Sequence, residues 1–562
     1  MKWHQVSRAV LFVTLVSLAG QAGPAKTQAQ PFASSLSQSV QVPVAAQRAI
    51  AFSLDHFTVD ARFTPAELPV PGFGRRMPTH HLVPEAVFQR IKAAALHNPY
   101  APFDPFARSF FDRLRPLTPA PLVKFAGLAE NGGVEPPDMA LAVSPNWVAQ
   151  GVNLQFAVFN RAGTLQSGWP KDIGAFFHVP SPGSCDPTPF MSDPRAFYLI
   201  SDQRFVLAAL QVDGAIIGTT CAPLSKYWIA VSKTNNPNGA WNIYSFDMRA
   251  GTQNVADFTQ IGYDANGIYF SGNMFDSSSG TYQYAEIFGA PKAKMEAGTA
   301  VTAHGFSKLK AGGLLVDTVQ PVDSLTQPPL ITTQPVEYFI NSKNILNCSG
   351  VCNGVTVWAF ANVLTTPTLT AANIATTNYS VPPNAPQPAG GSINTDDQRI
   401  SGTPVYQGGL ISFGLTTAVT NVDSMVVAGL FWGQVKPTLS GTTITGGSVF
   451  QSGYLSFRGN RGAYYPALVP DSRGNLYIGF GSSSSTSSAS AYYAARKVTD
   501  VHGALETTVP LFLGSGAYLG GRWGDYSAAA IDGNLTTSDA WVSLEYGTSA
   551  GLWATEIGAT RF

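Results

Sequence analysis

From about residue 121 to the C-terminus, short runs rich in β-branched and aromatic residues alternate with turns, without a βαβ rhythm. Gln155-Phe-Ala-Val-Phe159 is a typical run, and Asn160-Arg-Ala-Gly163 is a typical turn. Such side chains favour a pleated strand, and Asn or Asp followed by Gly favours a tight turn. The pattern indicates antiparallel strands over about 440 residues, whose sheet edges have to be protected by closure or by radial repetition.

Similar phrases recur along this region, each at a place where an innermost strand would begin. Two of them are Pro136-Pro-Asp138-Met-Ala-Leu-Ala-Val143 and Arg522-Trp-Gly-Asp525-Tyr-Ser-Ala-Ala-Ala530. The acids, or in one case a tyrosine, lie at positions 138, 193, 257, 323, 397, 465 and 525, with gaps of 55, 64, 66, 74, 68 and 60 residues. This spacing predicts an all-β propeller of seven four-stranded blades. Six blades with one long insertion is the main alternative, and a double sandwich is the third.

The first residues have the pattern of an export signal. Lys2 and Arg8 lie beside an apolar run of 11 residues, Ala9–Ala19, which is too short to span a bilayer and has the length of the apolar part of a signal peptide. Small residues follow, so we expect cleavage between about residues 22 and 31. No later stretch reaches 18 apolar residues. The sequence therefore predicts a secreted protein, extracellular or periplasmic, without a membrane span.

Composition divides the chain into three parts: a signal peptide (1–30), an N-terminal extension or pro-segment (31–120) and the propeller domain (121–562). The extension is rich in proline and is expected to be mostly irregular with one helix, Pro84–Leu96, which Asn98-Pro99 ends. Its sequence does not decide whether it wraps the propeller or is removed. We expect the strand near Leu122–Leu128 to pair with the last blade.

Export permits disulfides, and the four cysteines allow three pairings. Cys348 and Cys352 could close a small loop in which Gly350 provides the bend, and Cys185 and Cys221 would then close a longer one. A zinc site is disfavoured because no histidine lies near the Cys-x₃-Cys pair. Two disulfides are therefore predicted.

Charge excludes some classes of function. Thirty-four Lys and Arg balance 34 Asp and Glu, and charged residues make up only 12% of the chain. Without clusters of basic residues the chain lacks what nucleic-acid binding requires. Separately, we expect the protein to be a monomer. Metalloprotease, nucleotide-loop and dinucleotide motifs do not occur. The Ser-rich run at 481–488 predicts a flexible loop.

Several of the recurring phrases have counterparts in a known family. They are Pro136-Pro-Asp138, Ser192-Asp193-Pro194, Ile229–Lys233 with Asn238–Trp241, Asp257-Phe258 with Gly262, Tyr465-Pro-Ala467, Arg522–Ser527 and Glu545-Tyr546 before Trp553. They resemble a family of secreted, largely uncharacterised bacterial proteins with a sialidase-like propeller of the Asp-box type. The resemblance covers about residues 121–562 and implies a propeller and export, but no settled activity. The intact Asp-box pattern Ser-x-Asp-x-Gly-x-Thr-Trp does not occur, and Asp471-Ser-Arg-Gly474 is a degenerate version of it.

The recurring acids are the first candidate site. In a propeller the innermost strands line the channel, so residues at their starts converge on one mouth. A ring of like charges disfavours ionisation unless a cation or arginine neutralises it, and carboxylates suit Ca²⁺. The residues expected in such a metal site are Asp138, Asp193, Asp257, Asp397 and Asp525. The alternative is that each Asp accepts backbone N–H groups at the turn of its own blade.

Glycoside hydrolysis is the second hypothesis, since it needs two carboxylates, or a tyrosine nucleophile with an acid as in sialidases. Tyr465 and Asp193 could serve as nucleophile and acid. Arg195, Arg399 and Arg522 lie beside strand starts, where they could bind a substrate carboxylate or neutralise neighbouring acids. The candidate catalytic residues are Asp193, Arg399, Tyr465, Arg522 and Asp525.

The sequence thus favours an exported propeller that binds a glycan or an extracellular protein at the channel mouth. A glycoside hydrolase of sialidase-like architecture is the alternative, so it stays open whether the protein is an enzyme. No cofactor is indicated apart from Ca²⁺. Fold alone does not choose between these functions.

Overall fold

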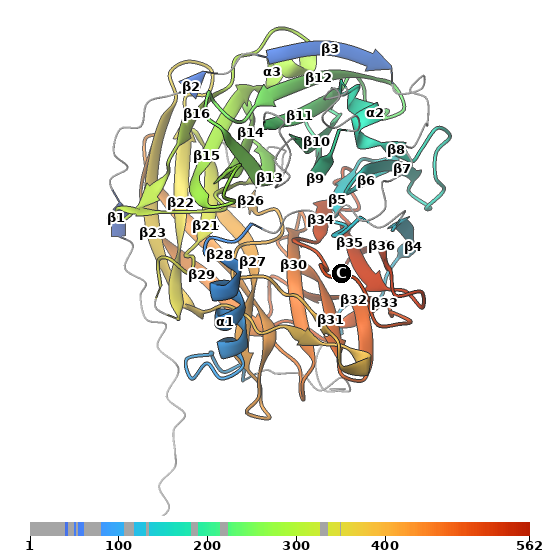
Figure 1. The fold of residues 1–562 in the computed structure, drawn as a ribbon. Coiled ribbons are helices and arrows are strands. Elements are labelled where there is room, and N and C mark those ends of the chain that lie inside the picture. Colours follow the sequence, from blue (N-terminus) through green and yellow to red (C-terminus); the bar gives the residue numbers. More distant parts are fainter. Residues whose placement is uncertain are drawn as a thin grey trace, which may run out of the picture. The chain divides into compact units, whose positions relative to one another are not determined.

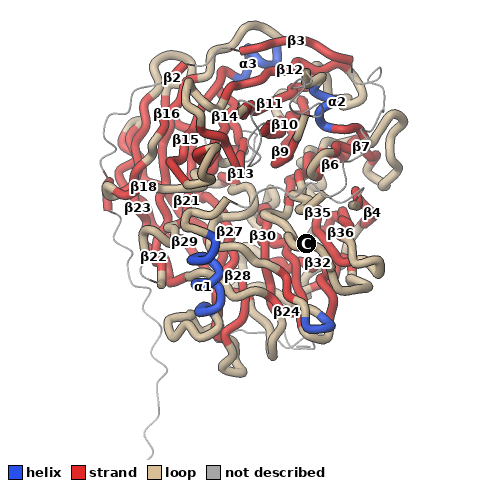
Figure 2. The backbone as a smooth tube through the Cα atoms, viewed as in Figure 1, coloured by secondary structure: helices blue, strands red, loops and turns tan. Residues whose placement is uncertain are grey.

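The computed structural model describes residues 40–42, 50–51, 54–60, 80–105, 117–130, 134–180, 189–213, 223–325, 335–348 and 350–562 (Figure 1). The chain divides into two units, 1–36 and 37–562, and all described residues belong to the second. The predicted signal peptide lies outside the described residues. Among those described, no helix is long and apolar enough to cross a membrane. The described part is mostly β-structure with few short helices, as expected (Figure 2).

Within the described residues, seven sets of antiparallel strands follow one another along the chain. The first set is β5 (Ala140–Val143), β6 (Trp147–Val152), β7 (Gln155–Asn160) and β8 (Lys171–Asp172). The second is β9 (Met191–Leu199), β10 (Arg204–Asp213), β11 (Leu224–Ser232) and β12 (Ala240–Asp247). The third is β13 (Asn254–Tyr263), β14 (Gly267–Asp276), β15 (Tyr282–Pro291) and β16 (His304–Ser307). The fourth is β19 (Gln320–Pro321), β21 (Val336–Ser342), β22 (Cys352–Ala361) and β23 (Thr368–Tyr379).

The later sets follow the same order. The fifth is β26 (Val405–Gln407), β27 (Leu410–Thr420), β28 (Val426–Ser440) and β29 (Thr443–Leu455). The sixth is β30 (Gly462–Pro470), β31 (Leu476–Ser484), β32 (Ser487–Arg496) and β33 (Val509–Phe512). The seventh is β34 (Ala528–Ile531), β35 (Ala540–Gly547), β36 (Trp553–Thr560) and β4 (Val123–Ala129). The short β20 (Asp323–Ser324) pairs in parallel with both β13 and β26 and so joins two sets into one sheet.

The seventh set combines the three C-terminal strands with β4, which precedes the first set in the chain. Strand β4 pairs antiparallel with β36, with Phe125 opposite Ile557 and Lys124 opposite Gly558. The expected pairing of the strand near Leu122–Leu128 with the C-terminal strands is therefore confirmed. The first strands of consecutive sets lie side by side except between the fourth and fifth, where β20 lies beside β26, and β34 of the seventh set lies beside β5 of the first.

Large side chains fill the space between consecutive sets. Between the first and second sets, Phe156 packs with Phe176 and Phe177 of the short helix α2 (Ile173–Phe177), and Phe176 meets Trp241 edge-on with ring centroids 5.4 Å apart. Trp241 is fully buried. This layer shows why the strands are so rich in aromatic residues, since each sheet packs face to face against its neighbours.

The extension contains more strand than expected. Residues of β1 (Val40–Val42), β2 (Ile50–Ala51) and β3 (Leu54–Asp60) pair with the outer strands β23, β16 and β12, respectively, so three sheet edges are covered. Backbone pairing at an open edge needs no distinctive side chains, which is why the sequence did not predict it. The predicted helix is present as α1 (Glu85–Ala95). Shorter elements are α3 (Lys292–Ala297), a 3₁₀ turn (Pro388–Gly390), β17 (Lys310–Ala311), β18 (Leu314–Leu315), β24 (Ala385–Pro386) and β25 (Ser392–Ile393).

Two local predictions have clear outcomes. The Cys348–Cys352 disulfide is present, whereas Cys185 and Cys221 lie outside the described residues. The prediction of a flexible Ser-rich loop is wrong, because the run belongs to β31 and β32. Ser482 is fully buried there, and its hydroxyl donates to the carbonyl of Gly462 at 2.8 Å, so a serine suits this strand as well as an apolar residue does.

Candidate functional site

The first strands of the sets begin at one end of the structure, which we call the mouth. At six of these starts a non-glycine residue takes the left-handed conformation, with φ between 47° and 53°. These residues are Asp138, Asp193, Phe258, Thr318, Asp396 and Tyr465. Because this conformation is uncommon for residues that carry a Cβ, the surrounding contacts have to hold each turn.

Polar side chains of the preceding set hold two of these turns directly. The N–H of Asp193 donates to Oδ1 of Asn153 at 2.9 Å, and Asn153 directly follows β6. Likewise the N–H of Thr318 donates to Oδ1 of Asn273 on β14 at 2.7 Å. Each of these turns is thus positioned by the second strand of the set before it, which brings the starts of the first strands together.

Two of the predicted acids link neighbouring sets. Asp138 Oδ1 accepts the N–H of Asp525 at 2.8 Å, and Asp193 Oδ2 accepts the N–H of Thr259 at 2.9 Å. The expectation that each Asp serves the turn of its own blade is wrong for these two, which bind the turn of another set. It is correct for Asp257, whose Oδ1 accepts the N–H of the next residue, Phe258, at 2.9 Å.

One of the seven recurring positions predicted to lie at a strand start, Asp323, lies at the other end of its strand. Asp323 lies on β20, beyond the start of the first strand, and lines a pocket at the opposite, far end. The acid at the mouth in this set is Asp317, which directly precedes the left-handed Thr318 and accepts Nδ2 of Asn344 at 2.6 Å. The sequence around Asp323 resembles the other recurring phrases in composition, and composition alone does not reveal where the chain turns.

The arginines of the mouth are paired with acids close by in sequence. Arg522 Nη2 donates to both carboxylate oxygens of Asp525, at 2.6 and 2.7 Å. Arg399 donates through Nε and Nη2 to the two oxygens of Asp397, each at 2.8 Å, and its Nε lies 3.4 Å from Asp396 Oδ2. Two-point contacts of this kind are strong and fix both partners.

Arg195 is held differently. Its Nε donates to the carbonyl of Thr259 at 3.3 Å, and the guanidinium carbon lies 3.3 Å from the ring centroid of Tyr526. Its Nη2 has no hydrogen-bond partner among the described residues. Arg195 is only 3% exposed, so the structure buries this cation below an aromatic ring at the mouth.

Tyr465, the proposed nucleophile, is buried and already engaged. Its hydroxyl donates to the carbonyl of Asn394 at 2.9 Å, and its N–H donates to Oγ1 of Thr416 at 3.0 Å. Burial and the charge of Asp396 raise the pKa of Tyr465 well above its usual range. In this arrangement the tyrosine holds a turn in place and keeps its proton.

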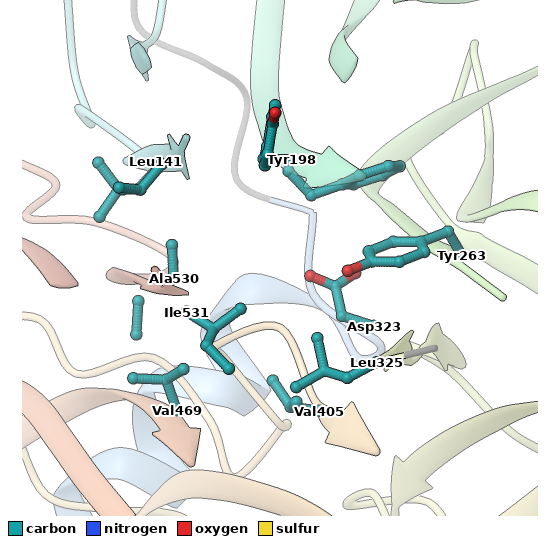
Figure 3. Close-up of a pocket in the computed structure, with 12 residues that line it drawn as sticks. Leu141, Tyr198, Tyr263, Asp323, Leu325, Val405, Val469, Ala530 and Ile531 are labelled. Carbon is teal, nitrogen blue, oxygen red and sulfur yellow. The ribbon is translucent and has the colours of Figure 1, made fainter. Parts of the chain in front are cut away.

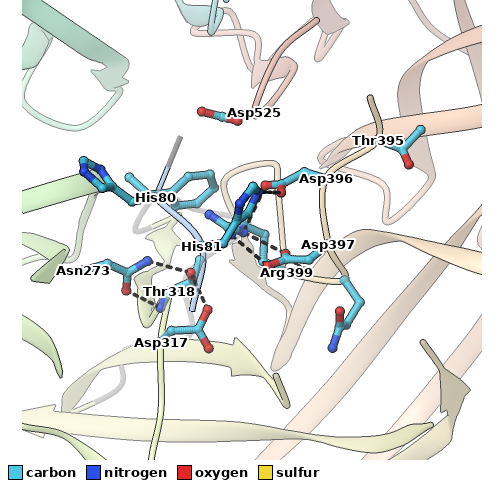
Figure 4. Close-up of polar contacts among 12 residues, drawn as sticks. His80, His81, Asn273, Asp317, Thr318, Thr395, Asp396, Asp397, Arg399 and Asp525 are labelled. Carbon is cyan, nitrogen blue, oxygen red and sulfur yellow. Dashed lines mark hydrogen bonds and ion pairs between the residues drawn. The ribbon is translucent and has the colours of Figure 1, made fainter. Parts of the chain in front are cut away.

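The extension brings basic groups into the mouth, and this was not predicted. His80 Nδ1 lies 3.2 Å from Asp257 Oδ2, and the His80 ring stacks on Phe275 with centroids 4.7 Å apart. His81 Nε2 lies 3.3 Å from Asp396 Oδ1 (Figure 4). The sequence offers only an adjacent His-His pair before the predicted helix as a signal, and nothing in that pair names its partners.

Lys92 of α1 is the third basic group. Its Nζ donates to Oγ1 of Thr395 at 2.7 Å and to the carbonyl of Asp396 at 2.6 Å, and the side chain is only 4% exposed. Burial lowers the pKa of Lys92 to about 7, although the charges of Asp396 and Asp397 act in the opposite direction. An amino group at this depth needs such partners, because an unpaired buried cation is costly.

The carboxyls of the mouth differ in their protonation. Burial, with the charges of Asp257 and Asp525, raises the pKa of Asp193 to about 7. Burial, with Asp525 and Asp193, raises the pKa of Asp138 well above its usual range. For Asp257, burial acts against ionisation, but the hydrogen bond and charge of His80 and the charge of Arg522 outweigh it and lower the pKa.

Acidic groups outnumber the arginines at the mouth. The seven carboxyls are Asp138, Asp193, Asp257, Asp317, Asp396, Asp397 and Asp525, and the three guanidiniums are Arg195, Arg399 and Arg522. The raised pKa of Asp193 follows in part from this excess of like charge. His80, His81 and Lys92 supply basic groups where the excess lies.

The metal prediction concerns the same carboxyls. Among the described residues, no three His, Cys, Asp or Glu side chains are placed to hold one metal ion. Ca²⁺ at the mouth stays a prediction, and a fall in melting temperature on chelation that Ca²⁺ reverses would confirm it.

A pocket lies at the far end, where residues from the first strands of the sets converge (Figure 3). Its walls are mainly apolar, with Leu141 and Leu325 among them, and Asp323, Tyr198 and Tyr263 are its polar members. Its cavity volume of about 20 Å³ has room for about one water molecule. The mouth therefore offers the richer chemistry of the two ends.

Comparison with known proteins finds only distant structural similarity. The chain matches no family model and no curated protein sequence. Among solved structures, a sialidase of Trypanosoma rangeli is similar at 8% identity and a TM-score of 0.32, over 78% of this chain and 60% of that one. An exo-β-1,3-galactanase of Clostridium thermocellum is similar at 11% identity and a TM-score of 0.27, over 78% of this chain and 100% of that one. Drosophila semaphorin 1b, extracellular domains 1–2, is similar at 8% identity and a TM-score of 0.30, over 79% of this chain and 87% of that one. Scores this low carry no information about activity.

Proposed function

We propose that this chain is an exported seven-bladed propeller that binds a basic segment of an extracellular protein at its channel mouth. The seven sets would be the blades, and the pairing of β4 with β36 would close the ring. Side-by-side first strands in cyclic order, with β34 beside β5, support this reading over six blades or a double sandwich. Export rests on the N-terminal pattern, and the Cys348–Cys352 disulfide fits it.

The observation that carries the proposal is that the mouth already holds basic groups of the chain itself. Lys92 is buried against Thr395 and the carbonyl of Asp396, and His81 contacts the Asp396 carboxylate. The pKa values of Asp257 and Asp396 are lowered, so these two carboxylates stay ionised, attract cations and repel anions. The ligand complementary to the mouth is therefore a peptide that presents lysine, arginine or histidine.

An acidic glycan suits this mouth poorly. A sialic acid would need arginines to bind its carboxylate, yet Arg399 and Arg522 each bind an Asp carboxylate through two contacts. A substrate carboxylate would have to displace those partners and would add a further negative charge. A glycan ligand, if one binds, should be neutral.

A second candidate function is the hydrolysis of a neutral glycoside, which one observation favours. The pKa of Asp193 is raised to about 7 by burial and neighbouring charge, whereas the pKa of its neighbour Asp257 is lowered against the effect of burial, chiefly by His80. Two carboxyls whose pKa values are driven apart are what general acid catalysis beside an ionised carboxylate requires. Tyr465 and Asp525 would then position the turns and arginines around them.

The experiment compares ligands of different charge on the mature chain. Hexalysine at millimolar concentration, a neutral oligosaccharide and sialyllactose are tested by thermal shift and calorimetry at low and high salt. We expect hexalysine to raise the melting temperature, with an effect that weakens in salt and in Asp257→Asn. Asp423→Asn is the control, because Asp423 lies on a turn and contacts the exposed Arg458.

The opposite pattern would support the hydrolase. A response to the neutral sugar alone, together with cleavage of an aryl glycoside, would replace the protein ligand by a glycan substrate. The rate should then depend on a group with a pKa near 7 and fall about 100-fold or more in Asp193→Asn. A response to sialyllactose alone would contradict both proposals.

A further inference from the structure

The segment that fills the mouth belongs to no sheet. Residues 80–105 contribute helix α1 and one isolated bridge, between Phe103 and Thr420, to the structure described here. Side chains hold the rest: His80 contacts Asp257, and Lys92 donates to Thr395. His81 contacts Asp396 (Figure 4). The segment could therefore leave without breaking strand pairing within any of the seven sets.

Its contacts are those of a ligand in a binding site. Phe88 is fully buried, and the His81 ring stacks on it with centroids 3.6 Å apart, so a small apolar anchor supports the charged contacts. Lys92 and Phe88 are four residues apart, on one face of α1. Arg90 and His97, in contrast, are exposed. Some basic side chains of the segment therefore contact the mouth while others of the same kind point to solvent, so the contacts are specific.

The chain on either side provides enough slack for withdrawal. Strand β3 ends at Asp60, and the next backbone pairing along the chain is the bridge from Phe103 to Thr420, so 42 residues (61–102) lie between these two points. At about 3.3 Å per residue 42 residues could extend to about 140 Å. Residues 80–96 can thus leave the mouth while both of these pairings stay in place.

We propose that residues 80–96 are a built-in competitor that occupies the mouth in place of an external basic protein segment. This inference rests on the proposed function and adds its regulation. A tethered competitor acts at an effective concentration of about a millimolar, so it lowers the apparent affinity of an external basic ligand, which then binds only at millimolar concentration or with a higher intrinsic affinity. Cutting the tether, or a ligand that binds more tightly, would open the mouth.

The test uses a fluorescent peptide of residues 80–98 as the probe for the mouth. Its affinity is measured by anisotropy against the mature chain and against the double variant His81→Gln/Lys92→Met, in which the internal segment is weakened. The control variant is Arg90→Met/His97→Gln, which removes the same kinds of side chain from exposed positions of the same segment. Amide exchange over 85–95 reports whether α1 has left.

We expect the probe to bind the His81→Gln/Lys92→Met chain at least tenfold more tightly than the unaltered and control chains. Amide exchange of α1 should rise in that variant alone. A probe that carries the same two substitutions should bind at least tenfold more weakly than the unaltered probe. Should the variant fail to fold, a protease site placed within 61–79 and cut after folding removes one tether and should give the same gain.

Each remaining outcome has a definite meaning. Equal affinity of the probe for all chains would overturn the competitor role and leave the proposed binding function intact. No probe binding to a chain whose α1 exchanges rapidly would overturn the basic-ligand proposal, and the competitor role with it. Unchanged exchange in both the variant and the cut chain, without probe binding, would show that residues 80–96 are a permanent part of the fold.

Discussion

Asp138 and Asp525 are joined at the mouth by a 2.8 Å hydrogen bond, although 387 positions separate them. Asp138 precedes the first strand of the first set, and Asp525 precedes that of the seventh. The second oxygen of Asp138 accepts Nδ2 of Asn153 at 2.8 Å. One buried carboxyl therefore links the first and last sets and helps to fix the turn that carries Arg522.

Replacing this carboxyl should separate its hydrogen-bonding role from its charge. Asp138→Ala leaves the N–H of Asp525 without a partner and removes one of the two acceptors of Asn153 Nδ2, which should lower the free energy of unfolding by about 2–4 kcal/mol. Asp138→Asn keeps an acceptor and should cost less than about 1.5 kcal/mol, because burial already raises the pKa of Asp138 and favours a neutral group. Urea unfolding followed by tryptophan fluorescence measures both. Equal losses in the two variants would contradict this account.

The convergence of the acids could be predicted from the sequence because it follows from repetition. Once the strand starts recur, Asp138, Asp193 and Asp257 have to meet at one end. The position of Asp323 could not be predicted in the same way, because its phrase resembles the others while the turn of the chain lies at Thr318. Register depends on which residue takes the left-handed conformation, and here neighbouring sets decide that.

The basic groups of the mouth could not be predicted at all. His80 meets Asp257 across 177 positions, and Lys92 meets Thr395 across 303. Helix α1 itself was predictable because its signals are local, such as the flanking prolines and Glu85. The face of the helix that is buried depends on the cluster against which it docks, and no local pattern encodes that.

The packing of β4 against the rest of its set can be tested at one glycine. A Cβ at Gly127 would lie 2.5 Å from Oγ1 of Thr555 and 2.6 Å from Oε1 of Gln150. Gln150 is buried and also accepts the N–H of Leu128 at 2.7 Å, so it cannot easily move aside. We expect Gly127→Ala to cost about 1–3 kcal/mol of unfolding free energy.

Gly272 in β14 provides the matched control, since a Cβ there would lie 3.4 Å from its nearest neighbours. Gly272→Ala should change stability by less than about 1 kcal/mol. If Gly127→Ala melts at the temperature of the unaltered protein, as Gly272→Ala is expected to do, this docking of β4 is wrong.

The second predicted disulfide can be counted directly. Cys348 and Cys352 are bonded, and Cys185 and Cys221 remain as the other predicted pair. Peptide mapping without reduction should recover a cross-linked peptide that contains Cys185 and Cys221, and titration of the denatured protein should find no free thiol. Two free thiols per chain would contradict the pairing.

The titration of Asp193 should be visible in the pH dependence of stability. Burial raises its pKa from 3.8 to about 7 in the folded protein, so between these values the folded state holds a proton that the unfolded state has released. Stability from this group is thus fully present below about pH 4 and is lost as the pH rises through 7. Asp193→Asn cannot titrate and keeps an oxygen for the N–H of Thr259.

The difference in unfolding free energy between Asp193→Asn and the unaltered chain should therefore shift in favour of the variant between pH 5 and pH 8. Urea unfolding at both values gives this difference, and titrations elsewhere in the chain cancel in it. Asp423→Asn, on an exposed turn, is measured in the same way as the control substitution. A pH-independent difference for Asp193→Asn would mean that Asp193 is ionised throughout this range. The proposed pair of Asp193 and Asp257 would then have no general acid, and the hydrolase proposal would fail.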